Sequence, residues 1–155
     1  MTQAVVAGAI VVATLNGLAG IVGAWVWYRG DPRAGRGASI FWVMLRVGQG
    51  SALTLAIAVG SLAAAGKHPR DDLFYLYALL PLAVGFLAEQ LRVTSAQTIL
   101  DQRGMENAQE VGALPDPEQQ ELLVAVLRRE LGVMALSALV VVFLALRAAG
   151  TAHGF

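Results

Sequence analysis

One apolar stretch decides the class of this protein: residues Ala4 to Tyr28, with the sequence AVVAGAIVVATLNGLAGIVGAWVWY, in which only Thr14 and Asn16 are polar. A helix needs about 20 predominantly apolar residues to cross the hydrocarbon core of a bilayer. The stretch exceeds the apolar region of a signal peptide, which is about 7–15 residues long, and no basic residues precede it. The sequence therefore predicts a retained transmembrane helix over about residues 4–28.

Three further apolar stretches follow, at about residues 40–65, 73–91 and 131–148. The chain is 57% hydrophobic and 14% charged, with a mean hydropathy of +0.63. This composition departs from that of soluble globular proteins in the direction of membrane proteins. We therefore expect an all-α integral membrane protein, with a single membrane domain over residues 1–155 built as a four-transmembrane-helix bundle.

The segment between the last two stretches, about residues 92–130, is polar enough to leave the bilayer and periodic enough to form helices. Within it, residues 112–118 have the sequence GALPDPE, which ends one helix and begins the next. Asp116 is the expected N-cap, Pro117 the first helical residue, and Gln119 completes a capping box. We expect the third and fourth helices to extend into a cytoplasmic helical hairpin. The alternative is a loose amphipathic loop on the membrane surface.

The basic residues predict the orientation, because cytoplasmic connections retain Lys and Arg. One side of the predicted membrane has seven of them, Arg29, Arg33, Arg36, Arg92, Arg103, Arg128 and Arg129, and the other has three, Lys67, Arg70 and Arg147. This asymmetry places both termini outside. Lys67 is the only lysine, and with abundant Ala, Val and Gly this Arg preference is typical of a GC-rich bacterial genome. We expect a multi-pass protein of the bacterial cytoplasmic (inner) membrane.

Several classes of function are disfavoured by composition. A formal net charge of zero gives no basic field for nucleic acid, and the absence of cysteine excludes disulfides and thiolate metal sites. The two histidines, His68 and His153, lie outside the predicted spans, so one chain cannot build an intramembrane bis-histidine haem site. No catalytic sequence motif occurs in a suitable context. We expect no catalytic residues, no metal and no cofactor.

Arg46 is the most informative single residue. It lies roughly 9 Å inside the second predicted span, where an unpaired Arg costs about 2.5–3.5 kcal/mol on insertion scales. Glu89 lies about one turn inside the same boundary on the third span, so we expect these two side chains to pair across helices. Gln49 and Gln90 would satisfy the remaining donors and acceptors. Whether this pair is structural or functional stays open.

Further arginines gather near the same boundary. Arg128, Arg129 and Glu130 are expected at a similar depth, and together with Arg92 and Gln97 they would form a polar chamber of net positive charge for an anionic lipid headgroup or another anionic ligand. The alternative is that the arginines other than Arg46 are simple cytoplasmic anchors.

Small and polar residues within the spans predict close helix packing. The second span has Gly48, Ala52, Ala56, Gly60 and Ala64 at four-residue spacing, and the first has Ala9, Ala13 and Gly17, followed by Gly20 and Gly23. Such stripes let helices approach closely, either within one chain or between copies. Asn16, near the middle of the first span, is expected to join helices by a hydrogen bond rather than to bind a ligand.

Three functions from different classes remain. A non-enzymatic scaffold or accessory subunit asks least of the sequence and ranks first, with the cytoplasmic hairpin contacting a partner. A homo-oligomeric channel or carrier, lined by the polar residues of the spans, ranks second. A lipid-handling enzyme using Glu89 as acid or base ranks last, because no nucleophile or metal accompanies it. The expected partners are membrane lipids, anionic ones among them, with further copies of the chain or another membrane protein.

Overall fold

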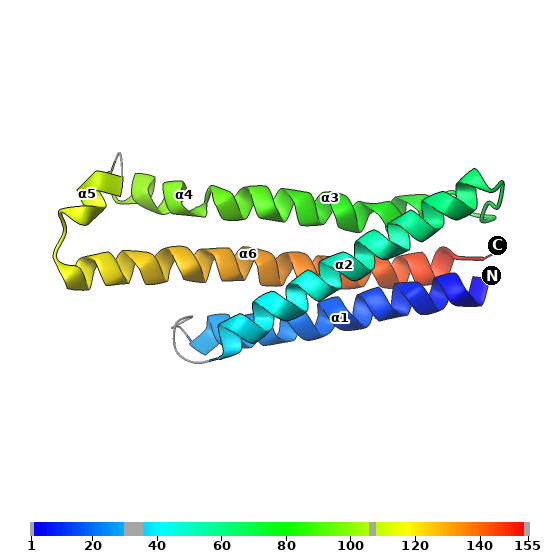
Figure 1. Ribbon diagram of the computed structural model, residues 1–155, viewed down its shortest axis with the longest axis horizontal. Helices are drawn as coiled ribbons and strands as arrows, with labels where there is room; N and C mark the ends of the chain where they lie inside the picture. Colours follow the sequence, from blue (N-terminus) through cyan, green and yellow to red (C-terminus); the bar gives the residue numbers. More distant parts are fainter. Residues whose placement is uncertain (1, 30–35, 106–107, 154–155) are drawn as a thin grey trace.

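The computed structural model describes residues 2–29, 36–105 and 108–153, and their regular secondary structure is entirely helical (Figure 1). The helices are α1 (Thr2–Arg29), α2 (Gly37–Ala64), α3 (Leu73–Val93), α4 (Ser95–Gln102), α5 (Ala108–Gly112) and α6 (Asp116–Thr151). The turn around Arg33, one of the arginines that predict the orientation, lies outside the described residues.

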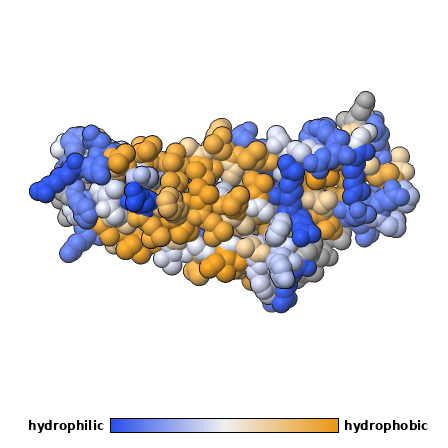
Figure 2. Space-filling view, turned by 180° about the vertical axis from the view of Figure 1, so that it is seen from behind, coloured by the Kyte–Doolittle hydropathy of each residue, from blue (hydrophilic) through white to orange (hydrophobic). Residues whose placement is uncertain are grey.

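Four of these helices, α1, α2, α3 and α6, are long and apolar enough to cross a membrane, as the sequence predicts. Large apolar side chains cover their outer faces; Ile21, Val43, Phe86 and Leu136 are each more than 60% exposed. Figure 2 shows an apolar surface between two hydrophilic ends. An exposed apolar surface of this extent is unfavourable in water and favourable in lipid. The described residues therefore form an all-α structure with four helices that could span a membrane.

Helix α6 lies between α1 and α3 and packs against both, while α2 runs obliquely across them from the end of α1 to the start of α3 (Figure 1). Because of this oblique path, α2 packs extensively on α1 and much less on α3 and α6. Both termini and the α2–α3 connection lie at one end of the molecule. Helices α4 and α5 and the beginning of α6 extend beyond the end of α1 and the start of α2 at the other end (Figure 1).

Glycines in α1 allow this close packing. A Cβ atom at Gly23 would lie 2.5 Å from the Phe41 ring and 2.8 Å from the Ala135 side chain, and one at Gly20 would lie 2.6 Å from Leu139. The small residues of α1 are therefore used within the chain. The stripe on α2 divides: Gly48, Ala52 and Ala56 are buried, whereas Gly60 and Ala64 are exposed.

The third helix, which the sequence predicts to extend into the hairpin, is interrupted before it reaches that segment. A turn at Thr94 separates α3 from α4. The Thr94 hydroxyl donates to the carbonyl oxygens of Gln90 and Leu91, at 3.2 and 3.1 Å, and the Ser95 hydroxyl donates to that of Leu91 at 2.9 Å. Such bonds compete with the backbone ladder of a helix. Gly104, with a φ of +69°, then follows α4 in the left-handed region that favours glycine.

The capping box predicted at the start of the fourth apolar helix is wrong. Pro115, not Asp116, is the N-cap of α6, and its carbonyl oxygen accepts from the backbone N–H groups of Glu118 and Gln119. The Gln119 side chain donates to the carbonyl of Leu114 at 2.8 Å instead of reaching back to Asp116. The amide thereby satisfies a carbonyl of the preceding turn.

Candidate functional site

The structure brings Arg46 of α2 and Glu89 of α3 together. Arg46 Nη1 donates to Glu89 Oε1 at 2.5 Å and to Gln49 Oε1 at 2.7 Å. Gln49 Nε2 lies 3.5 Å from the same carboxylate oxygen. Gln49 reaches both groups because it follows Arg46 by three positions on one helix face.

Arg92 and Glu130 complete a larger group that we call the ion cluster, consisting of Arg46, Glu89, Arg92 and Glu130. Arg92 Nε donates to Glu89 Oε2 at 2.8 Å, and its Nη1 lies 3.9 Å from Glu130 Oε2 on α6. The Arg92 guanidinium also lies over the ring of Trp42, 5.4 Å from its centroid. The cluster joins α2, α3 and α6, and its two cations and two anions cancel in formal charge.

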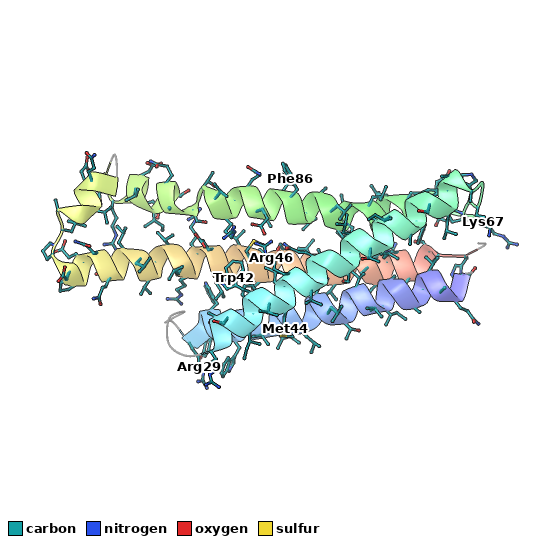
Figure 3. The ribbon with its side chains drawn as sticks, viewed as in Figure 1. Arg29, Trp42, Met44, Arg46, Lys67 and Phe86 are labelled. Atoms are coloured by element: carbon teal, nitrogen blue, oxygen red, sulfur yellow. The ribbon has the colours of Figure 1, made fainter. Side chains whose placement is uncertain are left out.

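The ion cluster lies at the edge of the bundle rather than at its centre. The side chains of Glu89, Arg92 and Glu130 are 25%, 32% and 21% exposed, and that of Arg46 is 53% exposed. In Figure 3 the labelled side chains of Trp42 and Arg46 lie where α2 crosses α6. Three members are thus partly shielded, while the Arg46 side chain is about half exposed although it is paired with Glu89.

Other residues predicted for the same site lie elsewhere. The Arg128 guanidinium is 5.0 Å from the ring centroid of Trp27, and with Arg129 it lines an open hollow of about 410 Å³ beside α1. Gln90 is exposed. The geometry therefore gathers a neutral cluster of four charges and leaves Arg128 and Arg129 on another side of α6. The aromatic partners Trp42 and Trp27 belong to other helices, and nothing in the sequence connects them to these arginines.

Asn16 is buried between α1 and α2. Its Nδ2 donates to the carbonyl oxygens of Val12, at 2.9 Å, and Gly48, at 3.2 Å. A Cβ atom at Gly48 would lie 2.8 Å from Asn16 Oδ1, so only glycine permits this approach. Because both partners are carbonyls, the amide nitrogen must face them. The remaining oxygen accepts no hydrogen bond from the described residues.

A cavity of about 240 Å³ opens between α2, α3 and α6, where α2 diverges from α3. Asn16 lines it, Gln49 and Glu89 lie toward one end, and Pro81 and Gly85 contribute the α3 wall. No local pattern in the sequence predicts this cavity. The sequence feature that corresponds to it is the pair Pro81 and Gly85. These residues are four positions apart, so they lie on one face of the helix and leave that face without bulky side chains.

A further concave region, of about 450 Å³, lies among α4, α5 and α6 at the end away from the termini, and is called the hollow below. Leu122, Leu123 and Val126 of α6 face it together with Ala96 of α4 and Val111. Arg103, at the end of α4, donates to Glu121 Oε1 at 2.8 Å and ties α4 to α6.

Comparisons with family models, with curated proteins and with solved structures give no match for this chain. The described residues contain no group of three or more His, Asp or Glu side chains placed to hold a metal ion. The functional argument therefore rests on the geometry of the ion cluster, the cavity and the hollow.

Proposed function

We propose that this protein is a non-enzymatic scaffold or accessory subunit of the bacterial cytoplasmic membrane. Its four spans would anchor a cytoplasmic helical hairpin, made of α4, α5 and the beginning of α6, that holds a protein partner. Both termini would lie outside. The observation that carries the proposal is the continuity of α6, whose 36 residues join the hollow to the apolar span without a break.

The charges of the segment support a projecting hairpin over one lying on the membrane. Residues 94–127 contain six carboxylates and one arginine, a net charge of −5. The cytoplasmic leaflet has a negative surface potential, which repels such a segment within a Debye length of about 8–10 Å. Arg92, Arg128 and Arg129 at the base of the hairpin are attracted to the same surface.

The hollow has the chemistry of a site for an amphipathic helix. Its apolar side chains, Leu122, Leu123 and Val126, would take the apolar face of the partner. The surrounding carboxylates, Asp116 among the hollow's own lining, favour a partner with Lys or Arg on its polar face. We therefore propose a basic amphipathic helix as the occupant.

The ion cluster supports a structural role for the membrane part. Each carboxylate has an arginine within 4 Å, and Gln49 occupies a further donor of Arg46. A catalytic acid or base needs a proton that it can exchange with substrate, and Glu89 is already engaged through both oxygens. This arrangement favours the scaffold over a lipid-handling enzyme.

Binding of a synthetic peptide tests the proposal. The full chain is placed in nanodiscs, and the probe is a helical peptide of Leu and Lys in an amphipathic pattern, compared with a scrambled peptide of the same composition. The expected result is binding of the amphipathic peptide, weakened by salt and by Leu123→Glu. The control Ala113→Glu adds the same charge at an exposed position that does not line the hollow, and should keep binding. Equal binding of both peptides, or an unaffected Leu123→Glu variant, would refute the proposed hollow.

The absence of cysteine permits a clean test of orientation. Single-cysteine variants Gln120→Cys and Thr151→Cys are treated with a membrane-impermeant maleimide. Labelling of Thr151→Cys in intact spheroplasts, and of Gln120→Cys only in inverted vesicles, is expected. The reverse pattern would contradict the proposed orientation while leaving the peptide experiment interpretable.

A further inference from the structure

The cavity between α2, α3 and α6 is separate from the hairpin, and the buried amide group of Asn16 forms part of its lining. Asn16 is 1% exposed, and both protons of its amide are used by the carbonyls of Val12 and Gly48. The described residues leave no fully buried side-chain oxygen or nitrogen without a partner. The Asn16 Oδ1 atom, which accepts nothing from those residues, therefore keeps its small access to the cavity that Asn16 lines.

The mouth of the cavity is apolar. Leu53 of α2 and Phe86 of α3 line it and are 50% and 65% exposed. In Figure 3 the labelled Phe86 projects from the outer side of α3. Both residues belong to helices long and apolar enough to span a bilayer, so a molecule entering between them would come from lipid.

The polar groups in and near the cavity determine which polar group a bound molecule can carry. The nearby ion cluster has no net formal charge, and its members are engaged with one another. A charged ligand would find no unpaired counter-ion among them and would retain the cost of burying its charge in hydrocarbon. A neutral hydrogen-bond donor, in contrast, could donate a hydrogen bond to Asn16 Oδ1.

The volume sets the size of the ligand. An engineered apolar cavity of about 150 Å³ holds benzene, so a cavity of about 240 Å³ takes a molecule on the order of ten heavy atoms. This is smaller than a two-chain lipid. Ala52, Leu82, Ala138 and Val141 provide apolar walls for such a molecule.

We propose that this cavity is a lipid-accessible binding site for a small, uncharged apolar molecule bearing a hydroxyl group, such as a medium-chain alcohol, whose hydroxyl donates to Asn16 Oδ1. The site is independent of the proposed scaffold function, because none of its lining residues belongs to α4, α5 or the hollow.

Photolabelling of the full chain in lipid vesicles tests the site. The probe is an analogue of 1-octanol that carries a diazirine, used beside its methyl ether and the corresponding carboxylate. The alcohol should label peptides that contain Leu53 or Phe86. Loss of one neutral hydrogen bond should make the ether about fivefold weaker. The carboxylate should label least.

A space-filling substitution locates the labelling. A Cβ atom at Gly85 meets nothing within 4 Å, so Gly85→Leu should fold and fill the cavity, reducing labelling to background. Gly60→Leu is the matched control, because Gly60 also has open space in a helix and does not line the cavity. Asn16→Leu should remove the preference for the alcohol over the ether.

Four results would overturn the inference. Equal labelling by alcohol and ether would show an apolar cavity without recognition of a donor. Preferential labelling by the carboxylate would show an anion site. Labelling that persists in folded Gly85→Leu would show that the probe binds outside the cavity. An absence of labelling above background would show that the cavity does not bind the alcohol and holds only water or lipid tails.

Discussion

Two ion pairs of similar length lie in different surroundings in this molecule. Arg46 and Glu89 pair within the apolar part, between α2 and α3, whereas Arg103 and Glu121 pair at the acidic end, between α4 and α6. The first belongs to a cluster of four charges with Gln49 and Trp42 beside it; the second is a single contact in which Glu121 is 69% exposed. Water replaces the partner of an exposed charge at little cost, while lipid offers no replacement. We therefore expect the pair in the apolar part to contribute more to the stability of the fold than the pair at the acidic end.

Removal of the shared carboxylate should have the largest effect. Glu89→Leu leaves Arg46 without a carboxylate in the apolar region and leaves Arg92 with Glu130 alone, at 3.9 Å, and we expect a loss of about 2.5–3.5 kcal/mol in the free energy of unfolding. Unfolding in mixed micelles with increasing sodium dodecyl sulfate measures it. Glu89→Gln retains an acceptor and should lose less. Equal stability of Glu89→Leu and the unmodified protein would contradict the larger contribution expected of the ion pair in the apolar region.

A charge-reversal pair tests the contribution of Arg92 to the cluster. Exchange of Arg46 and Glu89 for one another would place the new arginine beside Arg92, which now bonds Glu89 Oε2. We therefore expect Arg46→Glu with Glu89→Arg to restore only part of the stability lost in each single variant, measured by the same unfolding titration. Full recovery would mean that Arg92 contributes nothing to the cluster.

The neutral hydrogen bond of Asn16 should have an intermediate effect. Asn16→Leu removes the bond to the Gly48 carbonyl that joins α1 and α2, and interhelical hydrogen bonds of this kind contribute about 0.6–1.7 kcal/mol. Thr14→Val is the control, because the exposed Thr14 hydroxyl bonds only its own helix at Ile10. The same titration should show a larger loss for Asn16→Leu than for Thr14→Val.

The pair at the acidic end should have the smallest effect. We expect the coupling between Arg103→Gln and Glu121→Gln to be about 0.2–1 kcal/mol and to shrink as salt is added. A double-mutant cycle at two salt concentrations, with hydrogen exchange of α4 as the readout, measures it. A coupling as large as that of Glu89 with Arg46 would contradict the difference between the two regions.

The apolar helices were predictable because each one is specified by its own run of residues. Arg46 and Glu89 could also be paired from the sequence, since each is an ion inside a span at a similar depth from the same boundary. Arg92 and Glu130 were also expected near this boundary, and they do join the cluster. The aromatic partners were not predictable: Trp42 of α2 covers Arg92, and Trp27 of α1 lies beside Arg128. Periodicity gives the face of one helix but not the neighbour that covers it.

The cavity and the helix break at Thr94 were missed for different reasons. The cavity depends on the oblique path of α2, which no local pattern encodes, so Pro81 and Gly85 alone do not predict it. The break depends on hydroxyl groups that bond the preceding turn, in a segment where helix and turn propensities are closely balanced. The capping box failed because Gln119 had a competing acceptor at Leu114.

The uninterrupted length of α6 gives the molecule the geometry of a lever. Its 36 residues correspond to about 54 Å, of which a hydrocarbon core takes about 30 Å, so about 24 Å would remain beyond it. Transmembrane helices tilt when bilayer thickness changes. A change of 10° in the tilt of a rigid α6 would shift its outer end sideways by about 4 Å. A partner seated on Leu122 and Leu123 would then respond to the thickness of the membrane without touching a lipid.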